Sequence, residues 1–128
     1  MLSKASTCVA IVDDDDAVRA ALRRLLQAAG ISVEAFSGVG EFLASLGVTR
    51  PKCVVLDLHM PEITGLDLLS LISRAGANVP VIVITGDSSP DVEESVMRCG
   101  AAAVLRKPIE DKLLLDTIFA AITHSESR

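Results

Sequence analysis

The stretch VPVIVIT, Val79–Thr85, is the strongest strand signal in the chain, because five β-branched residues follow one another without a break from Val81 to Thr85. Four other short apolar runs also indicate strands: Cys8–Val12, Ile31–Phe36, Cys53–Asp57 and Ala101–Leu105. Segments with helical periodicity separate these runs. This alternation predicts an α/β domain in which helices cover both faces of a five-stranded parallel sheet.

Five helices are expected, and capping or helix-breaking residues mark their ends. These residues are Gly30, Ser37, Thr64 with Asp67, Ser89 with Pro90, and Gly100. The last helix carries the apolar stripe Leu114, Ile118, Ala121 and Ile122. The polar tail Thr123–Arg128 is expected to fray. The sequence thus predicts a single domain over residues 1–128, with an ordered core over about residues 6–123.

The composition excludes several classes of function. The 128 residues include 12 Lys and Arg against 17 Asp and Glu, a net charge of −5, which argues against nucleic-acid binding by this domain. Mean hydropathy is +0.48, yet no apolar run approaches the ~18 residues of a membrane-spanning helix. Aromatic residues make up only 2%, which disfavours binding by base or sugar stacking. We therefore expect an acidic domain without nucleic-acid or membrane partners.

The cysteines indicate a reducing compartment. Cys8, Cys53 and Cys99 are odd in number and form no C-x-x-C pair, so neither a disulfide framework nor a zinc site is expected. Cys8 and Cys53 lie in apolar runs and are expected to be buried. The N-terminus does not resemble a signal peptide, because its apolar stretch runs into four aspartates. A cytoplasmic location is the resulting expectation.

Reactive side chains gather at the carboxyl ends of the expected strands, the edge where ligands bind in open α/β sheets. They are Asp13, Asp14, Asp57, Thr85 and Lys107. Three carboxylates and one lysine leave excess negative charge, which a divalent cation would neutralise; an all-oxygen ligand set favours Mg²⁺, Mn²⁺ or Ca²⁺. Mg²⁺ commonly binds phosphate as well, so Asp57 is a candidate nucleophile toward a phosphoryl group, with Thr85 and Lys107 binding its oxygens. Asp15 and Asp16 more simply favour a helix N-terminus and pairing with Arg19.

The ordered motifs resemble the receiver domain of two-component response regulators, and the FixJ-type branch most closely. The resemblance covers nearly the whole chain and rests on five segments: Ile11–Asp15, Val55–Pro61 running on to Gly65, Ile82–Gly86, Gly100-Ala101 and Arg106–Pro108. It implies a flavodoxin-like sheet with strand order 2-1-3-4-5. It also implies a signalling module that promotes only its own phosphorylation and dephosphorylation, rather than an enzyme.

The resemblance implies a role for each matching residue. Asp57 would accept a phosphoryl group from a sensor histidine kinase or a histidine phosphotransfer protein. Thr85 and Lys107 would contact that group, and Pro108 would follow a cis peptide bond. The ligands of Mg²⁺, or alternatively Mn²⁺, would be the side chains of Asp13, Asp14 and Asp57 and the backbone carbonyl of His59.

Several alternatives stay open. A receiver usually has Tyr or Phe at the position of Val104, so activation must use other groups here, or the aromatic ring is dispensable. A docking module without phosphorylation is one rival function. An Asp-nucleophile phosphatase is a weaker one, since His59 stands where that family has a second acid. A homodimer could form through the fourth helix, fifth strand and fifth helix, where Leu115 and Phe119 flank the apolar stripe. The sequence leaves open whether a DNA-binding domain follows the receiver.

Overall fold

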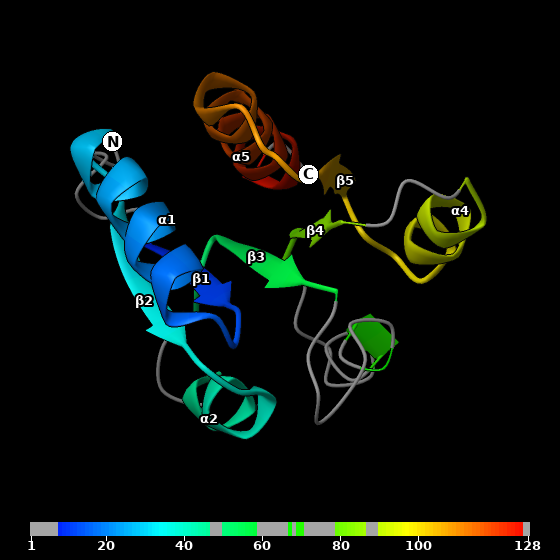
Figure 1. Cartoon of the computed structure of the whole chain (residues 1–128), viewed down its shortest axis with the longest axis horizontal. Helices are drawn as coiled ribbons and strands as arrows, with labels where there is room; N and C mark the ends of the chain where they lie inside the picture. Colours follow the sequence, from blue (N-terminus) through cyan, green and yellow to red (C-terminus); the bar gives the residue numbers. More distant parts are fainter. Residues whose placement is uncertain are drawn as a thin grey trace.

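The computed structural model describes residues 8–46, 50–58, 67, 69–70, 79–86 and 90–126. Five parallel strands form one sheet in the order β2-β1-β3-β4-β5, as expected. Figure 1 shows this sheet between two layers of helices. The strands are β1 (Cys8–Val12), β2 (Ser32–Phe36), β3 (Cys53–Asp57), β4 (Val81–Thr85) and β5 (Ala103–Arg106).

Side-chain alternation along the strands divides the core into two layers. On one face Val9, Ile11 and their neighbours pack against α1 (Asp16–Ala28) and α5 (Asp111–Glu126). On the other face Ala10 and Val12 belong to the layer that includes residues of α2 (Val39–Ser45) and α4 (Pro90–Arg98). Because β3 and β4 are buried throughout, their sequences are continuously apolar rather than alternating up to their last residues, Asp57 and Thr85.

Strand and helix boundaries differ from the expected ones at a few positions. β4 begins at Val81 rather than Val79, although the Pro80 carbonyl still accepts a bond from Val54 N at 3.0 Å. β5 runs over Ala103–Arg106 instead of 101–105. The N-cap of α2 is Gly38, without a side-chain hydrogen bond, so the prediction that Ser37 caps this helix is wrong. Thr64 lies outside the described residues, whereas Asp67, Leu69 and Ser70 are helical where the third helix is expected.

The expected ends of α1 and α4 are confirmed. Gly30 and Gly100, which follow these helices, have φ angles of 83° and 107°, a region that favours glycine. The prediction of a frayed tail is wrong over residues 123–126, since α5 continues to Glu126. Helix α5 extends beyond the stripe that ends at Ile122, so the apolar pattern alone underestimates its length.

The three cysteines are free thiols. Cys53 is fully buried, and burial raises its pKa to about 12, so it stays an unreactive thiol at neutral pH. Cys8 is only half-buried, contrary to expectation, because it begins the strand and its Sγ donates to Glu34 Oε1 at 3.7 Å. None of the helices in the described part of the chain is long and apolar enough to cross a bilayer.

Candidate functional site

The strand register brings the candidate residues to one edge of the sheet. Val12 pairs with Leu56, so Asp13 and Asp57 come next to each other at the ends of adjacent parallel strands. Asp57 in turn pairs with Ile84, which Thr85 follows at the end of β4. On the far side of β4, Lys107 N donates to the Thr85 carbonyl at 2.9 Å, so Lys107 reaches the same edge.

Three carboxylates form a compact acidic cluster. Asp13, Asp14 and Asp57 each offer one carboxylate oxygen, and these oxygens lie within 4.8 Å of one another. Asp13 and Asp57 are buried, with 2% and 5% exposure, whereas Asp14 is exposed. Three anionic oxygens from one exposed and two buried groups suit a hard divalent cation that keeps some of its water ligands. The donor set therefore fits Mg²⁺.

Lys107 supplies the positive charge beside this cluster. Its Nζ lies 3.7 Å from Asp57 Oδ1, and its side chain is 39% exposed, so the ammonium borders both the carboxylate and solvent. The Lys107–Pro108 peptide bond is cis, as the family resemblance implies. An ammonium in this position can attract an anionic group that approaches Asp57 from solvent.

Thr85 is the buried polar residue at the end of β4, with 1% exposure. His59, whose carbonyl is the fourth expected metal ligand, lies outside the described residues. The structure therefore brings Asp13, Asp14, Asp57, Thr85 and Lys107 to one edge, and the expectation for His59 stays a prediction.

Burial and like charge raise the pKa of Asp13. Burial has the largest effect, and the nearby Asp57 and Asp14 carboxylates raise the pKa further. The Asp15 backbone N–H and the Lys107 ammonium act in the opposite direction, but they do not reverse the shift. The negative charge at this edge is therefore only partly compensated by the protein.

Asp13→Asn is expected to stabilise the metal-free protein. An acid with a raised pKa binds its proton more tightly when folded, so stability falls as pH rises through the unfolded and then the folded pKa. Asparagine lacks this charge but keeps an oxygen for the Asp15 N–H, so the free energy of unfolding at pH 7 should rise by about 1 kcal/mol. Urea unfolding with EDTA, followed by circular dichroism because the chain lacks Trp and Tyr, measures this. A less stable variant at pH 7 would contradict the electrostatic interpretation.

The other two aspartates of the run Asp13–Asp16 belong to the helix N-terminus, as predicted. Asp15 is the N-cap of α1, and its Oδ1 accepts bonds from Ala17 N at 2.9 Å and Val18 N at 3.3 Å. Asp16 lies in the first turn and forms an ion pair with Arg19. The sequence reasoning missed a further contact, in which Arg19 Nη1 donates to the Asp13 carbonyl at 2.6 Å. Helical side chains lean toward the N-terminus, which is the signal that could have suggested it.

Val104 lies in the middle of β5, paired with Val83, and packs half-buried against the core layer of α2 and α4. Two residues later Arg106 Nη2 lies 3.2 Å from Glu93 Oε2 of α4. The ion pair thus links α4 directly to the strand that leads into Lys107.

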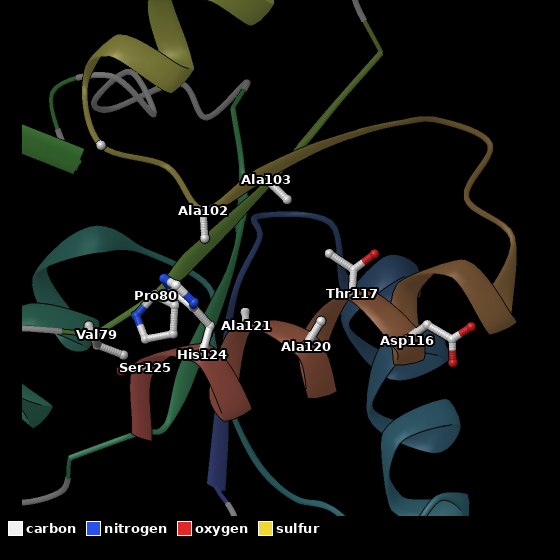
Figure 2. A pocket seen from close by; sticks show the side chains of 11 residues that line it. Val79, Pro80, Ala102, Ala103, Asp116, Thr117, Ala120, Ala121, His124 and Ser125 are labelled. Carbon is white, nitrogen blue, oxygen red and sulfur yellow. The ribbon is translucent and has the colours of Figure 1, made fainter. Parts of the chain in front are cut away.

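A surface cavity of about 620 Å³ lies at the opposite end of the sheet from the acidic cluster. Figure 2 shows its lining, which combines residues before or at the start of β4 and β5 with one side of α5. Pro80, Ala102 and Ala103 belong to the first group, and Ala120 and His124 to the second. Because the amino ends of the strands form this wall, the cavity is separate from the candidate site.

Comparison with known proteins identifies a family. The family model described as "Response regulator receiver domain" matches residues 9–119. FixJ of Azorhizobium caulinodans, a transcriptional regulatory protein, is 37% identical over 118 residues, covering 91% of this chain and 56% of FixJ. The response regulator protein TodT of Pseudomonas putida is 34% identical over 121 residues, covering 94% of this chain and 53% of TodT. The chain thus spans about half the length of these curated relatives.

Solved structures with a similar fold point to the same family as the sequence relatives. The crystal structure of FixJ-N superposes with a TM-score of 0.87 at 33% identity and covers 97% of both chains. A CheY-like receiver domain protein from Methanospirillum hungatei JF-1 has a TM-score of 0.88 at 26% identity, with 94% of this chain and 97% of that chain covered. The chain belongs to the response regulator receiver domain family of two-component signal transduction.

Proposed function

We propose that Asp57 accepts a phosphoryl group from a histidine of a sensor kinase or a histidine phosphotransfer protein, in a reaction that requires Mg²⁺. One observation carries this proposal. The carboxylate of Asp57 lies within 4.8 Å of the Asp13 and Asp14 carboxylates and 3.7 Å from Lys107 Nζ. Nucleophile, candidate metal ligands and phosphate-binding cation therefore share one edge of the sheet.

The side chains have distinct tasks in the proposed transfer. A carboxylate oxygen of Asp57 attacks phosphorus, the P–N bond of the phosphohistidine breaks, and its electron pair stays on the imidazole nitrogen. Lys107 binds one phosphoryl oxygen, and the Thr85 hydroxyl donates to another. Asp13, Asp14, Asp57 and the His59 carbonyl would hold Mg²⁺, which neutralises charge on the phosphoryl oxygens.

Metal dependence provides the test of this proposal. The domain is incubated with acetyl phosphate and Mg²⁺, or with acetyl phosphate and EDTA, and its intact mass is followed over time. We expect one phosphoryl group to be gained with Mg²⁺ and none with EDTA, because the crowded carboxylates repel the donor when no cation is present. A docking module without phosphorylation predicts no gain in either sample, and that result would overturn the proposal. An Asp-nucleophile phosphatase predicts continuous release of phosphate without a lasting gain in mass, because water hydrolyses its aspartyl phosphate in every turnover, and that result would also overturn the proposal.

We further propose that residues 1–128 form one cytoplasmic domain. Phosphorylation of this domain would be signalled to partners through the face formed by α4, β5 and α5. Two exposed large apolar side chains on the helices that form this face support it, since Met97 of α4 is 46% exposed and Leu113 of α5 is 49% exposed. Such side chains could pack in a homodimer. Leu115 and Phe119 do not add to this support, because both pack half-buried against the core layer of α1 and α5.

A further inference from the structure

Arg19 is a largely buried cation beside the acidic cluster. Its side chain is 18% exposed, whereas Arg23 and Arg24 of the same helix are exposed. A guanidinium is seldom removed from water unless partners satisfy its donors. The buried guanidinium of Arg19 therefore depends on hydrogen-bond partners in the protein, whereas the exposed Arg23 and Arg24 do not.

The two ends of the guanidinium contact different parts of the loop between β1 and α1. Nη1 donates to the Asp13 carbonyl oxygen at 2.6 Å, a charge-assisted bond. Nη2 pairs with the carboxylate of Asp16, which is 91% exposed. Since the fork of arginine is planar and rigid, both contacts together fix its orientation.

The contact with Asp13 acts on the peptide bond that joins two candidate metal ligands. The Asp13 carbonyl and the Asp14 N–H lie in one rigid plane, so a bond to this oxygen fixes how the chain enters Asp14. Other bonds already hold Asp13, because its N–H donates to the Phe36 carbonyl at 3.1 Å and its Oδ1 accepts from Asp15 N at 2.9 Å. Asp14 is exposed, and no hydrogen bond from the described residues holds its side chain. Its placement therefore depends on the backbone that Arg19 anchors.

We propose that Arg19 is a positioning residue for the metal site, which orients the Asp13–Asp14 peptide so that both carboxylates face the cation. This inference rests on the proposed Mg²⁺-dependent function. The predicted change in Mg²⁺ affinity when Arg19 is replaced is opposite to the change expected from charge alone. A nearby positive charge repels Mg²⁺, so removing it should tighten metal binding if charge alone matters. Removing a group that orients ligands should instead weaken metal binding, typically by about 10-fold.

Mg²⁺ titration of the ¹⁵N-labelled protein, followed by amide NMR shifts, tests the inference without any phosphodonor. The spectra report folding and the Kd for Mg²⁺ in the same experiment. The variants are Arg19→Met, which keeps the apolar stem, and Arg19→Lys, which keeps the charge but not the fork. Arg23→Met is the matched control, because it removes a positive charge from the exposed side of the same helix. We expect the Kd to rise about 10-fold in Arg19→Met and less in Arg19→Lys, and to stay unchanged or fall in Arg23→Met.

A Kd for Arg19→Met equal to or below that of the wild type would overturn the inference, as would equal effects of Arg19→Met and Arg23→Met. Should Arg19→Met fail to fold, Arg19→Lys decides, and an unchanged Kd in that variant counts against the positioning role. Absence of Mg²⁺ binding in the wild type would overturn the proposed function together with this inference. Binding by the wild type with no loss in the Arg19 variants would overturn this inference alone.

Discussion

Asp57→Asn is expected to reduce phosphoryl gain from acetyl phosphate and Mg²⁺ below detection. The amide has nearly the shape of the carboxylate but lacks the anionic oxygen that attacks phosphorus. Asp57 is 5% exposed and belongs to a crowded set of three carboxylates, so replacing it with a neutral group removes repulsion and should not unfold the domain. Intact mass after incubation measures the result, with circular dichroism as a check of folding.

Asp91→Asn serves as the control for this variant. Asp91 is an exposed residue in the first turn of α4 and is not one of the three clustered carboxylates. The variant carries the same chemical change, and we expect it to be phosphorylated at the wild-type rate. Continued phosphorylation of Asp57→Asn would show that another side chain is the acceptor.

Lys107→Met is expected to slow phosphorylation by about 100-fold, the order of effect seen when one charged or hydrogen-bonding group is removed from a reacting anion. Lys107 Nζ lies 3.7 Å from Asp57 Oδ1 and borders solvent, so it can bind the incoming phosphoryl group as well as Asp57. Its removal leaves the carboxylates without their nearest described cation, which should tighten Mg²⁺ binding while it slows transfer. The rate of phosphoryl gain at saturating Mg²⁺ separates these two effects.

Lys112→Met is the corresponding control, because Lys112 lies exposed in the first turns of α5. It loses the same charge and should react like the wild type. Equal rates for Lys107→Met and the wild type would mean that Lys107 does not contact the transferred group. A weaker affinity of Lys107→Met for Mg²⁺ would contradict the electrostatic argument for this edge of the sheet.

Much of the fold can be predicted from the sequence because buried parallel strands leave a strong local pattern. The run that contains β4 is apolar at each position from Val79 to Ile84, and parallel strands end at a common edge, which places Asp13 near Asp57. The candidate cluster follows from these two facts alone. The end of α5 could not be predicted in the same way, since its last turn beyond Ile122 has no apolar stripe.

The contacts of Arg19 show why other features could not be predicted. Its pairing with Asp16 follows from spacing along a helix, but its bond to the Asp13 carbonyl depends on how the chain turns between β1 and α1. Likewise, Ser37 and Gly38 are both acceptable N-caps by residue type, and the backbone rather than the sequence selects Gly38. Sequence patterns report the periodic elements, whereas these features depend on the geometry of the turns between them.

Val104 of β5 stands where receivers usually have Tyr or Phe. Val104 is half-buried against the core layer of α2 and α4, so its small side chain is part of the packing between β5 and that layer. The Arg106–Glu93 ion pair provides another link between β5 and α4. In the proposed function, a change at Lys107 would therefore have a route to α4 through the backbone of β5 and this pair.

The position of the phosphoryl group tests the central claim most directly. Borohydride reduces an acyl phosphate on aspartate to homoserine and releases phosphate, while a phosphoryl group on a hydroxyl survives the treatment. The phosphorylated domain is reduced, digested and sequenced by tandem mass spectrometry. We predict homoserine at position 57 and unchanged aspartate at positions 13 and 14. Homoserine at either of those two positions, or a borohydride-resistant phosphoryl group on Thr85, would contradict Asp57 as the phosphoryl acceptor.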